Sequence, residues 1–154
     1  MIRSLCLFAL STALGALAAC GAPTHPINPP NASIQQLDVL PDGSWKVQIR
    51  LENFSDITVR YATFKAALRV GGVAAGDISL NPQLDIPGEN ADIVATTLNP
   101  GADVRKAFAS DVKLPGGVPY ELKGTINIPA AGKDFKFEHK SRLLPVPGIA
   151  NQYR

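Results

Sequence analysis

The sequence predicts an all-β domain, an immunoglobulin- or fibronectin III-like antiparallel sandwich of about seven strands with one short helix. Three observations favour this fold class. Apolar and polar residues alternate along several segments, which is typical of half-buried strands. The 13 glycines and 13 prolines are scattered along the chain and mark frequent turns. Charged residues make up only 18% of the chain, below the roughly one quarter of an ordinary globular protein.

Residues 1–19 have the pattern of a secretory signal peptide. Arg3 gives a positive start, and a run of apolar and small residues follows from Leu5 to Ala19. This run is shorter than the roughly 20 apolar residues that a membrane span needs. It ends in Leu17-Ala18-Ala19-Cys20-Gly21, which resembles the lipobox of bacterial lipoproteins, where the cysteine is lipid-modified and becomes the N-terminus.

Cys20 is therefore the predicted lipid-attachment residue. The chain has two cysteines, and Cys6 would be removed with the leader, so the mature protein cannot form an internal disulfide. The alternative is an ordinary cleaved leader with an incidental cysteine. By resemblance to the enterobacterial sorting pattern, Gly21 indicates a bacterial lipoprotein held in the outer membrane and facing the periplasm.

Residues 20–32 are predicted to be a lipidated cysteine followed by a proline-rich tether. Proline disfavours helix and supplies no donor to a sheet, so this segment should be extended. His25 lies here without a metal-ligating neighbour and is expected to be solvated. Since Arg3 leaves with the leader, 14 basic and 13 acidic side chains remain, and no basic face indicates nucleic-acid binding.

Residues 33–144 are the predicted sandwich, and residues 145–154 an extended tail that could cover a sheet edge. The first strand is expected at 33–40. Asp42-Gly43 then favours a tight turn, and an antiparallel strand follows at 45–51. Trp45 keeps phase with the apolar positions of that strand, so we expect it in the core rather than at a ligand site.

Asn53-Phe54-Ser55 matches an N-glycosylation sequon, but in a bacterial lipoprotein the match is treated as accidental. Asn53 and Asp56 are instead predicted to form a turn with their side chains bonded to their own backbone. Strands are expected at 63–70 and, after Gly71-Gly72, at 77–80.

The strand predicted at 91–98 has apolar residues on both faces, so we expect it in the centre of a sheet. Asn99 and Pro100 should open a short helix with Val104, Ala107 and Phe108 on its buried face.

Two more strands are expected at 120–128 and near 135–139, joined by a hairpin loop. His139 continues the apolar face of the second strand. We expect it to be a buried, hydrogen-bonded histidine, with the rim of a pocket as the alternative.

No catalytic arrangement is evident. The mature chain's thiol is at its N-terminus, two histidines are too few for a histidine-based zinc site, and no GxSxG, Walker or GxGxxG motif occurs. Asp85, Glu89 and Asp92 could form a glycosidase pair or a calcium loop, but solvated loop charges are the favoured interpretation. We therefore predict no enzyme, no metal, no cofactor and no small-molecule substrate.

From Trp45 to Leu98 the chain resembles a WHy domain of the late embryogenesis abundant (LEA) type 2 family. The matching segments are an alternating strand ending in Asn, an apolar linker, a long strand, a glycine step and a Pro-Gly loop, at 47–53, 57–61, 64–70, 72–76 and 86–89. Phe54 and Ser55 stand where the family has proline and a second asparagine.

This resemblance implies an immunoglobulin-like sandwich without catalytic residues, which protects proteins or membranes during desiccation or similar stress. The expected partners are the membrane, through the lipid on Cys20, and weakly bound client proteins. The alternative is a structural envelope lipoprotein that docks one protein partner by adding a strand at a sheet edge. An enzyme is the third possibility, and it would require a pocket of clustered titratable groups.

Overall fold

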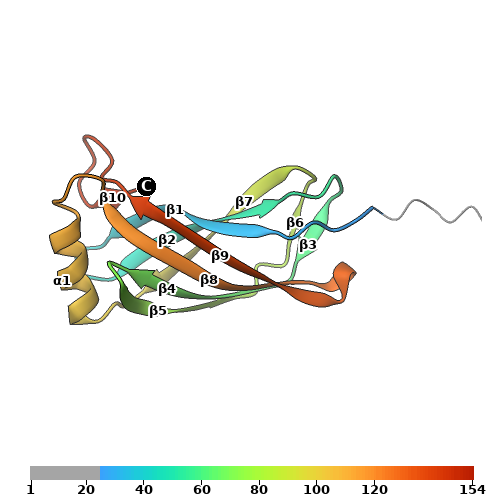
Figure 1. Ribbon diagram of the computed structural model, residues 1–154, viewed down its shortest axis with the longest axis horizontal. Coiled ribbons are helices and arrows are strands. Elements are labelled where there is room, and N and C mark those ends of the chain that lie inside the picture. The colour runs from blue at the N-terminus through green and yellow to red at the C-terminus, as the bar shows by residue number, and fades with distance from the viewer. Residues whose placement is uncertain (1–24) are drawn as a thin grey trace, which may run out of the picture.

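The computed structural model describes residues 25–154, which form ten strands and one α-helix (Figure 1). Seven strands have eight residues or more: β1 (Asn31–Val39), β2 (Trp45–Asn53), β4 (Thr63–Val70), β5 (Val73–Leu80), β7 (Asn90–Leu98), β8 (Val118–Ile128) and β9 (Lys133–Leu143). Three are short: β3 (Val59–Tyr61), β6 (Leu84–Ile86) and β10 (Gln152–Tyr153). They build two facing antiparallel sheets, β10-β1-β2-β7 and β5-β4-β8-β9, and a small β3-β6 ribbon. The predicted all-β sandwich with one short helix is confirmed.

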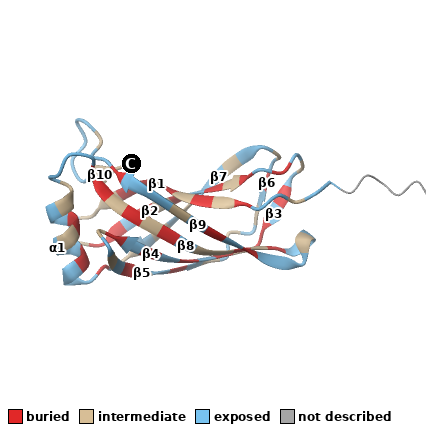
Figure 2. Ribbon diagram, in the orientation of Figure 1, coloured by how far each residue is buried: buried red, intermediate tan, exposed pale blue. Residues whose placement is uncertain are grey.

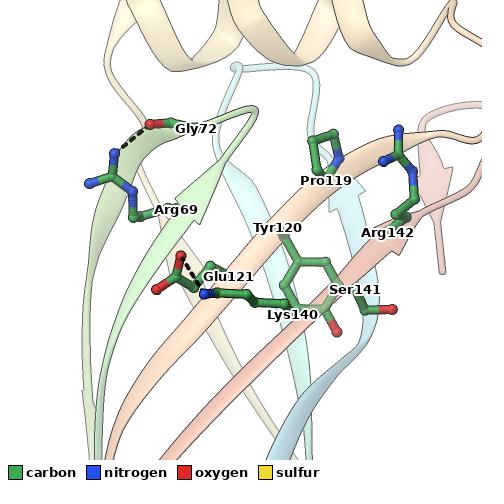
Figure 3. Close-up of a pocket in the computed structure, with 8 residues that line it drawn as sticks. All are labelled: Arg69, Gly72, Pro119, Tyr120, Glu121, Lys140, Ser141 and Arg142. Atoms are coloured by element: carbon green, nitrogen blue, oxygen red, sulfur yellow. Dashed lines mark hydrogen bonds and ion pairs between the residues drawn. The ribbon is translucent and has the colours of Figure 1, made fainter.

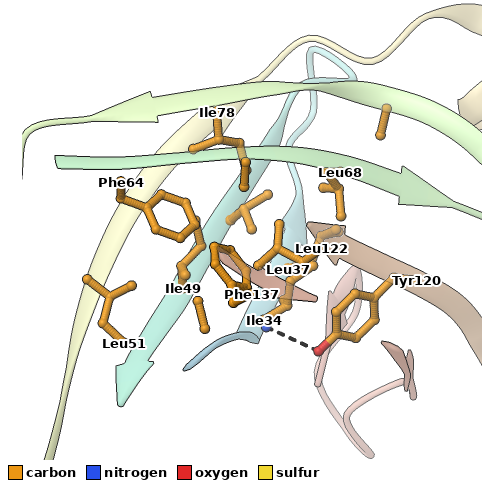
Figure 4. Packing of buried hydrophobic residues seen from close by; sticks show 14 of the residues in the cluster. Ile34, Leu37, Ile49, Leu51, Phe64, Leu68, Ile78, Tyr120, Leu122 and Phe137 are labelled. Atoms are coloured by element: carbon orange, nitrogen blue, oxygen red, sulfur yellow. Dashed lines mark hydrogen bonds between the residues drawn. The ribbon is translucent and has the colours of Figure 1, made fainter. Parts of the chain in front are cut away.

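The core lies between the two sheets and is filled from alternate positions of their strands (Figure 2). Along β2 and β4 the buried positions recur at every second residue, as the sequence pattern predicts. Trp45 is 1% exposed, which confirms its predicted place in the core. Figure 4 shows the packed side chains, among which Phe64 and Phe137 stack with ring centroids 5.6 Å apart.

The helix α1 (Ala102–Asp111) covers one end of the sandwich and begins later than predicted. Gly101 is its N-cap, with an extended backbone and no side-chain capping bond, so Asn99 and Pro100 precede the helix. Of the predicted buried face, Val104 and Phe108 are buried, whereas Ala107 is only partly buried.

β7 lies at the edge of its sheet, whereas the sequence predicts a central strand. Within residues 25–154 it pairs only with β2, and none of its nine residues is buried. The prediction is wrong because it assumed that apolar side chains on both faces require cover on both. In the structure Ile93 of β7 remains 46% exposed.

Two other strands also differ from the prediction. β5 already begins at Val73, because Gly71 and Gly72 have positive φ values and form a tight turn that pairs Val70 with Val73. β6 was not predicted, since its three residues carry too short a pattern. It pairs with β3, the segment that the sequence marks as an apolar linker.

The C-terminal tail folds back on itself instead of running straight. Leu144 and Arg154 exchange two backbone hydrogen bonds, and β10 pairs with β1 at Leu37 and Asp38. The tail therefore covers part of a sheet edge, which is one of the arrangements expected from the sequence.

Asn53, at the end of β2, is 2% exposed and has a fully hydrogen-bonded amide. Its Nδ2 donates to the carbonyl oxygens of Ile57 (2.8 Å), Ile86 (3.0 Å) and Pro87 (3.0 Å). Its Oδ1 accepts from the backbone N–H of Ser55 at 2.9 Å, which confirms the predicted turn. One side chain thus joins the loop after β2 to the loop before β7.

The last residues of the predicted tether are bonded to this same turn. The backbone N–H of Asn28 donates to Ser55 Oγ at 3.0 Å, and its Nδ2 donates to the Phe54 carbonyl at 2.7 Å. His25 is half-exposed, and its Nδ1 lies 2.9 Å from Asp56 Oδ2. The sequence predicts that the Asp56 side chain bonds its own backbone, and this is wrong, because the Asp56 carboxylate contacts His25 of the tether instead.

Replacing Asn53 by alanine would leave the three carbonyl oxygens without this donor. An unpaired buried polar group costs about 1–3 kcal/mol, so we expect Asn53→Ala to lower the free energy of unfolding by roughly 3 kcal/mol in urea denaturation. Asn127→Ala removes one exposed hydrogen bond, to Asp134, and should cost less than about 1 kcal/mol. Equal losses in the two variants would contradict the role given to Asn53.

Two buried tyrosines hold backbone groups of other strands with their hydroxyls. Tyr61 donates to the Glu52 carbonyl at 2.8 Å, and the Tyr120 hydroxyl accepts the Ile34 N–H at 3.1 Å (Figure 4). Burial raises the pKa of both phenols above the ordinary 10.0, and the nearby Glu52 carboxylate raises the pKa of Tyr61 further.

This pKa difference predicts an alkaline loss of stability. The unfolded tyrosines lose their protons near pH 10 and the folded ones only at higher pH, so their contribution is complete below about pH 10 and falls above it. We expect the free energy of unfolding to decrease above that pH, and to decrease less steeply in the double variant Tyr61→Phe, Tyr120→Phe. Identical slopes in denaturation experiments would contradict this explanation.

Candidate binding edge

The edge of the first sheet at β1 is already occupied. β10 pairs with one half of the strand, and the Val39 N–H donates to the Asn151 carbonyl at 2.9 Å. In the other half, the Ile34 N–H is bonded by the Tyr120 hydroxyl. Little of the outward-facing backbone here is left for another chain.

The two edges of the second sheet are protected in other ways. β5 contains an irregularity opposite Leu68 and Arg69, where Gly76 has a φ of 145°. Bulges of this kind interrupt the regular hydrogen-bond pattern of a strand. β9 carries exposed side chains of alternating charge, which disfavour pairing with a further strand: Lys133, Asp134, Lys136, Glu138, Lys140 and Arg142.

β7 has none of these protections. Its nine residues pair with β2 without a register shift and include a single charged residue, Asp92. Figure 2 shows the strand in the colours of intermediate and exposed residues, in contrast to the buried stretches of β8. A long, regular and nearly uncharged edge is a template for pairing with another polypeptide.

Two side-chain hydrogen bonds reveal which backbone groups of β7 face outward. The N–H of Ala91 donates to Asn90 Oδ1 at 2.9 Å, and that of Ile93 to Asp92 Oδ1 at 2.7 Å. Alternate residues of an antiparallel strand face the same neighbour, so Ala95 and Thr97 also face away from β2.

Within residues 25–154 no strand pairs with this outward side of β7. The first half is capped by its own Asn and Asp side chains. In the second half, residues 94–98, no hydrogen bond within residues 25–154 engages the outward backbone groups of Ala95 and Thr97, and we refer to this half as the open edge. A hollow of about 270 Å³ beside it could receive a side chain of an added strand; it is lined by Leu80, Asn81, Pro82, Val94 and Ala95.

The acidic residues singled out in the sequence are not gathered at one site within residues 25–154. The predicted signal peptide and Cys20 lie outside the described residues. Asp85 is paired with Arg60 at 3.0 Å, Asp92 caps its neighbour, and Glu89 is exposed. In the described part of the chain, no three His, Cys, Asp or Glu side chains come together as possible metal ligands.

His139 has a hydrogen-bonding partner, as predicted, but it is only partly buried. Its Nδ1 lies 3.4 Å from Asn31 Nδ2 in a partly buried contact. Its ring stacks on that of Tyr120, with centroids 6.0 Å apart. The histidine thus contributes to the contact between β9 and the start of β1.

A hollow of about 490 Å³ on the exposed face of β4, β8 and β9 is rich in charge (Figure 3). Its charged groups already have partners. Arg69 Nη2 donates to the Gly72 carbonyl at 2.5 Å, Arg142 Nη2 donates to the Gly117 carbonyl at 2.9 Å, and Lys140 lies 2.7 Å from Glu138. The hollow is consistent with a charged outer sheet face.

Comparison with known proteins gives no family assignment. No family model and no curated protein matches the chain. The solution structure of AT1g01470 from Arabidopsis thaliana is 12% identical, over 86% of this chain and 92% of that chain, with a TM-score of 0.48. A crystal structure of a protein from Archaeoglobus fulgidus is 12% identical, over 79% and 100%, with a TM-score of 0.38. Neither similarity is close enough to carry an argument.

No helix within residues 25–154 is long and apolar enough to cross a membrane.

The open edge of β7 was not predicted, although the sequence carries a signal for it. The strand with apolar residues on both faces was identified, and the structure places it where one backbone side is free.

Proposed function

We propose that the protein is a non-enzymatic lipoprotein of the bacterial cell envelope, of the LEA type 2/WHy kind, that protects proteins or membranes during desiccation or other stress. The observation that supports a protective role is the open edge of β7. Stress exposes extended, apolar segments of other proteins, and such segments are what an unpaired strand can hold.

Binding through main-chain groups suits protection of many different proteins. Every polypeptide has the same backbone donors and acceptors, so an edge strand need not read a particular sequence. Each hydrogen bond contributes only about 1 kcal/mol net, so the few bonds available at residues 94–98 favour weak, reversible contacts. A client could then refold once the stress ends.

The proposed anchor would hold this edge close to the envelope membrane. Asn28 and His25 tie the tether to the turn around Asp56, so residues 20–24 alone would separate the lipid from the bonded segment. They can span at most about 17 Å when fully extended. The turn would therefore lie near the membrane, while the helix lies at the opposite end of the sandwich (Figure 1).

A second candidate is a structural envelope lipoprotein that binds one protein partner by strand addition. The same open edge supports it, because strand addition to a sheet edge can also be specific when side-chain pockets accompany it. The hollow beside Val94 and Ala95 is such a pocket. Isolation of one stoichiometric partner would favour this candidate over many weakly held clients.

The protective role predicts that a proline in the open edge abolishes protection. Ala95→Pro removes an outward N–H, whereas the matched control Ala91→Pro alters the capped half of the same strand. We expect wild type and Ala91→Pro to raise the recovered activity of a heat- or drying-sensitive enzyme above that obtained with an inert protein, and Ala95→Pro to give no excess.

Both variants should keep the wild-type urea midpoint, since neither proline removes a bond to β2. Equal protection by Ala95→Pro would show that the edge is not used. Absence of protection by the wild-type protein would leave partner binding, tested by crosslinking at the open edge, as the surviving candidate.

The proposed anchor predicts that Cys20→Ala releases the protein from the membrane fraction. The lipid is attached at the thiol, and no other anchor is proposed. Fractionation of cells expressing wild type and Cys20→Ala would test this. Unchanged processing and membrane association of the variant would contradict the lipoprotein assignment.

A further inference from the structure

The end of the sandwich opposite the tether contains a third hollow, of about 280 Å³, which we call the end pocket. It lies between α1, the start of β2 and the folded C-terminal tail. Its apolar wall consists of aromatic and branched side chains, and its rim carries basic side chains. The lining residues that the argument uses are Trp45, Phe108, Val112, Tyr153, Arg105 and Lys113.

Three aromatic rings from different parts of the chain form the wall. The centroids of Trp45 and Phe108 are 5.0 Å apart, and those of Phe108 and Tyr153 are 4.8 Å apart in an edge-to-face arrangement. Such contacts fix the rings in place, so the wall is largely pre-formed. A flat apolar group fits this surface better than a polar one.

The rim of the pocket carries two positively charged side chains. Arg105 and Lys113 line the pocket with no acidic residue, and neither forms an ion pair in the described part of the chain. Two carboxylates of the adjoining segments accept hydrogen bonds from neutral side chains rather than from Arg105 or Lys113. Asp38 accepts from the Gln152 side chain at 2.9 Å, and Asp42 accepts from Ser44 Oγ at 2.6 Å.

The turn before β2 leaves room for the Arg105 guanidinium. A Cβ built on Gly43 would lie 2.7 Å from Arg105 Nη1, and the φ of Gly43 is +83°. The positive φ favours glycine in this turn, and the absence of a side chain leaves space for the guanidinium above it.

We propose that the end pocket binds a small carboxylate with a flat, apolar body. The body would lie against Phe108 and Tyr153, and the carboxylate would accept hydrogen bonds from Arg105 and Lys113. A guanidinium suits a carboxylate because its N–H groups can bond both oxygens at once. A volume near the lower limit of the roughly 300–1,000 Å³ of ligand pockets selects a one-ring compound.

Trp45 is the only tryptophan in the chain, so intrinsic fluorescence reports directly on this pocket. The experiment titrates the purified protein with phenylacetate and, as the neutral isostere, with phenylacetamide. We expect a saturable change with phenylacetate and about tenfold weaker binding of the amide, because the amide lacks the charge that both cations recognise.

Variants of the rim residues then test whether Arg105 and Lys113 recognise the carboxylate. Arg105→Gln and Lys113→Gln should each weaken phenylacetate binding by about tenfold and leave the amide unaffected, since charge-assisted bonds are the stronger ones. Lys106→Gln changes a helix cation that does not line the pocket and should have no effect. All three side chains are exposed, so folding should be retained, which thermal melts would verify.

Equal affinity for the acid and the amide would overturn the proposal, as would unchanged affinity in the Arg105→Gln, Lys113→Gln double variant. The absence of a saturable fluorescence change with phenylacetate would overturn it as well. None of these outcomes bears on the open edge of β7.

Discussion

The hydrogen bonds of the Asn53 amide are the constraint on which the rest of the arrangement depends. They join the turn after β2 to the loop that leads into β7, and Asn53 itself pairs with Asn90, the first residue of that strand. The same turn receives the tether through Asn28. The Asn53 bonds therefore hold the loop before β7 beside the end of β2, where the nine-residue pairing of the two strands begins.

The four sheet edges are not equally protected against pairing with another chain. A tyrosine hydroxyl and the C-terminal tail cover β1, an irregularity interrupts β5, and alternating charges flank β9. Proteins use such devices because unprotected edges pair with other chains. By contrast, β7 is regular and has a single charged residue, Asp92, which supports a role in binding another chain.

Strand patterns were predictable from the sequence where burial alternates. Thr63–Val70 has the predicted bounds, and Trp45 is in the core because it shares the phase of β2. The position of β7 could not be predicted, since an apolar pattern does not reveal which strand lies beside it. The end pocket could not be predicted either, because Trp45, Phe108 and Tyr153 are far apart in the sequence and meet only in the fold.

Amide hydrogen exchange on β7, with and without an unfolded polypeptide, tests the central claim most directly. In the free protein the amides of Ala95 and Thr97 should exchange fast, while those of Val94 and Thr96, which face β2, should be protected. Adding an extended peptide rich in valine and threonine should slow exchange at Ala95 and Thr97. Fast exchange at both amides in the presence of bound peptide would contradict strand addition at this edge.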